Sequence, residues 1–106
     1  MIRQVTYKMV KGGIWDTIAA EERRHRELLA EELQRLLKKL VELGAEKVIL
    51  FGSYAQGWAD LFTDLDLIAV IDSDLSFFER AAWAYKQLRP RVALDLFLYT
   101  PSERNR

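Results

Sequence analysis

Apolar residues along the chain follow two different periods, and the change between them separates helices from strands. From Asp16, a residue type that favours helix N-caps, leucines recur at helical spacing until Gly44, so we expect one long helix over 16–43. Residues 21–27 within it are nearly all charged, and we expect them to extend beyond the core into solvent or against a partner. The apolar stripe is wide enough to cover a sheet and contains Leu29, Leu33, Leu36, Leu40 and Leu43.

After Gly44 the pattern changes to short apolar runs of strand length. A short helical piece at 54–57 and a helix over 77–88, with Ser76 as its N-cap and Pro90 at its end, connect these runs. This order of elements predicts an α/β (α+β) fold, a small mixed sheet of three or more strands covered by helices. The predicted strands are 47–51, 64–71 and 92–98.

The two ends of the chain carry weaker patterns. Residues 3–10 alternate weakly and are either an edge strand or an arm, while Pro101 is expected to end the ordered part and 102–106 to be disordered. The chain length suits a single domain, 1–106. We divide it into an N-terminal extension with the start of the long helix, 1–27, and a core that carries the motifs, 28–99.

Composition excludes several classes of chemistry. The chain has no cysteine and one histidine, so disulfides, zinc fingers and thiol catalysis are excluded. That histidine, His25, lies in the charged stretch and is interpreted as a surface residue. Any metal must therefore be held by oxygen ligands, which favours Mg²⁺ or Mn²⁺.

Charge and hydropathy set the expected surroundings of the protein. The formal net charge is zero, so no overall field or basic channel draws the chain to nucleic acid. No apolar run approaches the ~20 residues needed to cross a bilayer, and the N-terminus lacks the pattern of a signal peptide. We expect a soluble, cytoplasmic protein without a membrane partner.

Three aspartates carry the strongest chemical signal. Asp64 and Asp66 occupy positions i and i+2 of a predicted strand, so their carboxylates point to the same face of the sheet. Asp95 lies among apolar residues of another predicted strand. If these strands are neighbours, three carboxylates converge and form a ligand set for magnesium ions that also bind substrate phosphates. The alternatives are a strand leading into a turn for the first pair, and a salt bridge to Arg89 or Arg91 for the third aspartate.

A second signal precedes these aspartates. Gly52 and Ser53 directly follow a predicted buried strand and begin a short helical piece, where backbone N–H groups and a hydroxyl favour phosphate. On its own the pair is more often a simple turn. The combination Gly-Ser-x10-Asp-x-Asp, however, arises by chance in about one chain of this length per thousand. The two signals together predict a metal-bound triphosphate at one end of the sheet.

These residues and spacings resemble the DNA polymerase β-like nucleotidyltransferase superfamily, and the small size resembles its minimal nucleotidyltransferase branch. The resemblance covers about residues 28–99 and implies a nucleotidyltransferase fold. It implies that Gly52 and Ser53 contact the triphosphate. It also implies that Asp64 and Asp66 bind two Mg²⁺ ions, and that Asp95 ligates one of them and helps to activate the attacking hydroxyl.

The same resemblance implies a partner and a reaction. Members of this branch are commonly antitoxins of HEPN-domain toxins, and some transfer AMP from ATP to a tyrosine hydroxyl of the toxin. Many relatives carry arginine where this chain has Tyr54 and Gln56. The alternatives are a non-catalytic module that neutralises its partner by contact, and an adenylyltransferase for a small hydroxylated molecule. A homo-oligomer is a further possibility. Trp58 either stacks on a base or partner surface or plugs the sheet.

Overall fold

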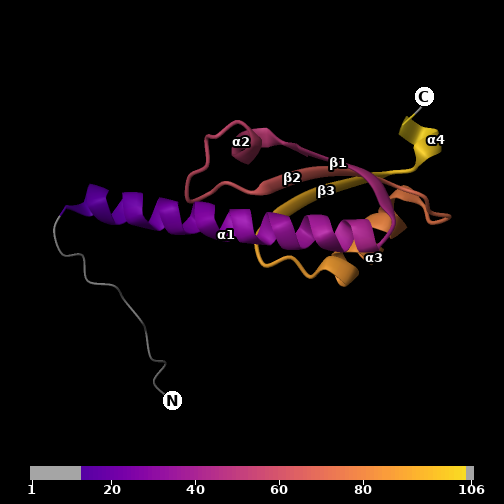
Figure 1. The fold of residues 1–106 in the computed structure, drawn as a ribbon, viewed down its shortest axis with the longest axis horizontal. Coiled ribbons are helices and arrows are strands. Elements are labelled where there is room, and N and C mark those ends of the chain that lie inside the picture. Colours follow the sequence, from indigo (N-terminus) through magenta and orange to yellow (C-terminus); the bar gives the residue numbers. More distant parts are fainter. Residues whose placement is uncertain (1–12, 105–106) are drawn as a thin grey trace, which may run out of the picture.

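The computed structural model describes residues 13–104, and Figure 1 shows their arrangement. The expected edge strand or arm at 3–10 lies outside the described residues. Helices and strands follow one another in the predicted order, each within two residues of a predicted boundary except where noted below. The elements are α1 (Ile14–Glu42), β1 (Ala45–Phe51), α2 (Gly52–Ala55), β2 (Leu65–Ile71), α3 (Phe77–Leu88), β3 (Leu94–Tyr99) and α4 (Pro101–Arg104).

The three strands form one mixed sheet in the order β1-β2-β3. β1 and β2 are antiparallel, whereas β2 and β3 are parallel and are connected through α3. Consequently the end of β1 lies at the same edge of the sheet as the beginnings of β2 and β3. In the register, Asp66 is paired with Phe51 on one side and with Asp95 on the other.

Helices cover one face of this sheet. Along β3 the residues alternate strictly between buried and exposed, so one face carries Leu94, Leu96 and Leu98 and the other Asp95, Phe97 and Tyr99. The buried face packs against the leucine stripe of α1 and against Ala84 and Leu88 of α3. The fold is therefore the expected α/β arrangement with a small mixed sheet, and its covering helices leave the aspartate face open. The core residues of α1 are Leu29, Leu33, Leu36 and Leu40.

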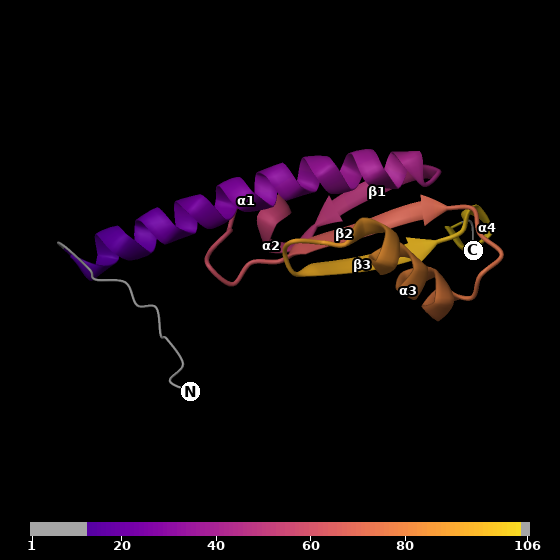
Figure 2. The same cartoon turned by 90° about the horizontal axis from the view of Figure 1, so that it is seen from below.

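The long helix α1 extends past the sheet. At about 1.5 Å per residue it is ~43 Å long, whereas a seven-residue strand spans ~23 Å. Its N-terminal half reaches beyond the edge where β1 ends and β2 begins (Figures 1 and 2). The predicted N-cap is wrong, because the cap residue is Gly13 and Asp16 lies in the first turn, where its charge favours the helix dipole.

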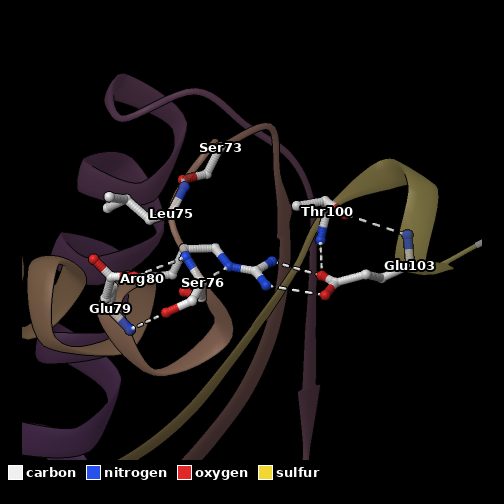
Figure 3. A network of polar contacts seen from close by, with 7 residues as sticks. All are labelled: Ser73, Leu75, Ser76, Glu79, Arg80, Thr100 and Glu103. Carbon is white, nitrogen blue, oxygen red and sulfur yellow. Dashed lines mark hydrogen bonds and ion pairs between the residues drawn. The ribbon is translucent and has the colours of Figure 1, made fainter.

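The C-terminal prediction is also wrong, because Pro101 begins α4 instead of ending the ordered part. Figure 3 shows the reason: Arg80 of α3 forms two hydrogen bonds to Glu103, at 2.6 and 3.0 Å, although the arginine side chain is only 3% exposed. The backbone N–H of Thr100 donates to the same carboxylate at 2.7 Å. Ser76 is the predicted N-cap of α3 and forms a full capping box with Glu79.

A buried glutamate attaches α1 to the segment that leads into β3. Glu32 is 2% exposed and accepts hydrogen bonds from the side chain of Arg35 and from the backbone N–H of Arg91. Arg35 also donates to the carbonyl of Arg89 at 3.2 Å. These contacts fix the turn around Pro90 and therefore the starting point of β3, one residue before Asp95.

Candidate active site

The carboxylates of Asp66 and Asp95 lie side by side on the open face of the sheet. The two residues are direct partners in the parallel pairing of β2 and β3. Burial raises the pKa of Asp66, a hydrogen bond and the charge of Asp95 raise it further, and the charge of Asp64 adds a smaller effect. Asp95 forms no ion pair with Arg89 or Arg91 within residues 13–104, so the salt-bridge interpretation is wrong.

Asp64 lies at the rim of this pair rather than inside a closed cluster. It precedes the first residue of β2, and its charge reaches Asp66. In the part of the chain that the structure describes, no three carboxylate or histidine side chains are close enough to form a preformed metal cage. The expected convergence of all three carboxylates is therefore not found among the described residues: Asp66 and Asp95 form a pair, and Asp64 affects Asp66 only through its charge.

Gly52 allows the end of β1 to approach this carboxylate pair closely. Its φ angle is +80°, a conformation that side chains with a Cβ adopt rarely. A Cβ placed on Gly52 would lie only 2.0 Å from Oδ2 of Asp66. Ser53 follows in the first turn of α2 and is exposed, while its carbonyl accepts a hydrogen bond from the N–H of Trp58 at 2.9 Å. The predicted phosphate turn and the predicted metal ligands therefore meet at one place.

The two positions at which relatives carry arginine differ in their surroundings. Tyr54 is partly buried and packs against the hydrophobic core. Gln56 ends the single turn of α2 and is exposed. Because α2 has only four residues, its dipole is small, and the predicted phosphate contact would depend on the N–H groups and the Ser53 hydroxyl.

The loop between α2 and β2 joins the Gly52-Ser53 turn to Asp64 and carries exposed aromatic residues. Trp58 is 72% exposed and Phe62 is 88% exposed. The plug interpretation of Trp58 is therefore wrong, whereas stacking on a base or a partner stays a prediction. Sequence reasoning also missed the contact of His25, whose ring nitrogen Nε2 lies 2.9 Å from the carbonyl oxygen of Thr63 in this loop.

The nucleotidyltransferase domain model matches residues 29–105 of the sequence, which is most of the chain. The chain belongs to the nucleotidyltransferase domain family. The fold of this nucleotidyltransferase is similar to the crystal structure of a "putative nucleotidyltransferase" from Sulfolobus solfataricus, with a TM-score of 0.53. The similarity covers 92% of this chain and 84% of that chain at 21% identity, and at this identity it supports the fold alone. No protein in the curated set matches the sequence.

The family assignment supports nucleotidyl transfer as the general activity of this nucleotidyltransferase. The roles of the predicted residues stay predictions, although Gly52, Asp66 and Asp95 lie together and Ser53 and Asp64 lie next to them in the chain. Within residues 13–104, no helix combines the length and the apolar composition needed to cross a membrane.

Proposed function

We propose that this nucleotidyltransferase transfers AMP from ATP to a hydroxyl of a partner protein, with Mg²⁺ as its cofactor. One observation carries the proposal: the Asp66 and Asp95 carboxylates adjoin the Gly52-Ser53 turn on an open face of the sheet. A triphosphate and its divalent cation need an anion cradle and carboxylate oxygens at the same place. Here the turn and the Asp66 carboxylate are so close that a Cβ on Gly52 would lie 2.0 Å from Oδ2 of Asp66.

The donor set at this place fits magnesium. Burial and the neighbouring Asp95 carboxylate raise the pKa of Asp66, and a bound divalent cation would favour the ionised carboxylates. Magnesium is usually held by one or two carboxylates together with substrate phosphates, so a closed protein cage is not required. Asp64, Asp66 and Asp95 would hold two Mg²⁺ ions, with Mn²⁺ as a substitute. When bound, the metal neutralises phosphate charge and lowers the pKa of an attacking hydroxyl.

The protein residues would position the reactants and move one proton. Gly52 and Ser53 would hold the triphosphate through backbone N–H groups and the hydroxyl. A bond forms between the acceptor oxygen and the α-phosphorus while the bond to pyrophosphate breaks, in line with the attack. Asp95, which is exposed to solvent, would take the proton from the attacking hydroxyl.

The surface around the site supports a protein acceptor. Trp58 and Phe62 are exposed in the loop that leads to Asp64, and exposed aromatic groups of this kind are enriched in protein interfaces. We propose that the chain acts in the cytoplasm as the antitoxin of a HEPN-domain toxin and that the toxin supplies the hydroxyl. A second candidate is a non-catalytic antitoxin that acts by contact, which the core position of Tyr54 favours because it leaves no cation beside the phosphates.

Intact-mass spectrometry tests the proposal directly. The protein is mixed with the product of the neighbouring gene, with ATP, and with Mg²⁺ or EDTA. A mass gain of one or more AMP units on the partner, present with Mg²⁺ and absent with the Asp66→Asn variant, is the expected result. A stable complex without a mass gain would reject the transferase in favour of the contact mechanism.

A further inference from the structure

The loop that ends at Asp64 is closed by a compact hydrogen-bonded turn. The N–H of Asp60 donates to the hydroxyl of Thr63 at 2.8 Å, and that hydroxyl donates to the Asp60 carboxylate at 3.1 Å. The N–H of Phe62 donates to the same carboxylate at 2.8 Å. Thr63 is 8% exposed, whereas the Phe62–Asp60 bond is exposed to solvent. Together these bonds hold residues 60–63 in one compact turn.

His25 attaches this turn to the long helix. Its Nε2 atom lies 2.9 Å from the carbonyl oxygen of Thr63, although the two residues are 38 positions apart in the chain. A carbonyl can only accept a hydrogen bond, so Nε2 carries the proton and donates. His25 belongs to the N-terminal half of α1 (Ile14–Glu42), and that half of the helix extends past the edge of the sheet (Figure 2).

This contact holds the backbone of Asp64 from one side while the sheet holds it from the other. The carbonyl of Thr63 and the nitrogen of Asp64 belong to one planar peptide group, so fixing the oxygen fixes the orientation of that plane. On the far side, the N–H of Leu65 donates to the carbonyl of Ala93 at 3.0 Å. Asp64 lies just outside β2 and depends on this external attachment for its position.

We infer that His25 is a positioning residue, which orients Asp64 for metal binding through the Thr63 carbonyl. The inference rests on the proposed metal role of Asp64. It gives the N-terminal half of α1 a role in the site, and it makes the geometry of the third carboxylate depend on the docking of that helix. Removing a residue that orients a metal ligand, without itself contacting the metal, commonly changes metal affinity or activity by about 10- to 100-fold.

Three variants separate positioning from simple stabilisation. His25→Ala removes the donor, while His25→Gln keeps an N–H donor at a similar distance from the backbone. Arg26→Ala changes a neighbouring exposed side chain and is the matched control. In metal-free protein, hydrogen–deuterium exchange of the backbone amides at 58–65 is expected to accelerate in His25→Ala and to stay near the wild-type rate in the other two variants.

The second measurement is Mn²⁺ affinity in the presence of ATP. His25→Ala is expected to weaken Mn²⁺ binding by about 10-fold, and His25→Gln to restore most of it. Faster exchange with unchanged Mn²⁺ affinity would overturn the inference, since the histidine would then only fasten the loop. Unchanged exchange would overturn it as well. If wild-type protein binds no Mn²⁺, the proposed metal site itself is rejected, while the exchange data still report on the histidine contact.

Discussion

Adding a single methyl group at Gly52 should damage the candidate site, because no other described glycine would place a Cβ so close to a neighbouring atom. The alanine would have to adopt a φ angle of +80°, which costs an L-residue about 1–2 kcal/mol. Its Cβ would also lie 2.0 Å from Oδ2 and 2.9 Å from Cγ of Asp66, more than an ångström inside ordinary contact for the oxygen. Since Asp66 is anchored in the central strand, its carboxylate has to rotate away from residue 52, which changes its geometry relative to Asp95.

The expected effects are large enough to measure. Overpacking of this kind costs about 1–3 kcal/mol in addition to the backbone term. A displacement of ~1 Å at a reacting group is sufficient for a 100-fold loss of rate. Gly57→Ala is the matched control, because Gly57 has nearly the same φ angle, +82°, and nothing lies within 4 Å of its added Cβ. Urea unfolding and the rate of AMP transfer are measured for both variants.

The difference between the two variants isolates the contact with Asp66. A second change, Asp66→Ala, removes the carboxylate and leaves only the Asp66 Cβ position, 3.2 Å away, so it should recover part of the stability lost by Gly52→Ala. If Gly52→Ala unfolds at the same urea concentration as Gly57→Ala and keeps its activity, the close approach of turn and carboxylate is refuted.

Further predictions concern pH, capping and proton transfer. Because burial and neighbouring carboxylates raise the pKa of Asp66 above its ordinary 3.8, its ionisation destabilises the fold at neutral pH. Metal-free Asp66→Asn should therefore melt at a higher temperature than wild type at pH 7, and the gain should vanish below pH 3.8. A hydrogen bond from Arg80 lowers the pKa of Glu103 from 4.5 to about 2, so this pair stabilises the fold fully above pH 4.5 and progressively less down to pH 2. The Glu103→Gln variant should have a lower free energy of unfolding than wild type at pH 7. In acid titrations this difference should shrink as the pH falls from 4.5 to about 2. Ser76→Ala should lower the free energy of unfolding by ~1 kcal/mol in urea through loss of the cap. Asp95→Asn should fold normally by circular dichroism and lose transfer in the mass assay.

Local patterns were sufficient to predict most of the fold. The leucine stripe of α1 and the Ser76 cap of α3 are determined by neighbours within a few residues, and both predictions are confirmed. Pro101 was misinterpreted because α4 is stabilised by Arg80, which lies 23 residues earlier in the chain. The sequence also did not indicate that Glu32 is buried and accepts a hydrogen bond from the backbone of Arg91, because these two residues are distant in the chain.

In the candidate site, too, local features could be predicted and those that depend on distant contacts could not. Asp66 and Gly52 could be named from spacing, because the strand and turn around them are local features. The register that pairs Asp66 with Asp95 is a property of the assembled sheet. His25 offered only a weak signal, a lone histidine in a charged helix, because its contact with Thr63 forms only when the loop folds back onto α1.

The position of Asp95 on an edge strand also bears on intermolecular strand pairing. In the sheet of the described residues, β3 is one of the two outer strands, and its remaining residues are Leu94, Leu96, Phe97, Leu98 and Tyr99. Six-residue apolar segments at an open edge are templates for intermolecular strand pairing, and a single charge is a common way to prevent it. The carboxylate proposed to accept a proton would thus also oppose edge-to-edge pairing of β3. Neutral variants at this position therefore require light scattering before any loss of activity is attributed to chemistry.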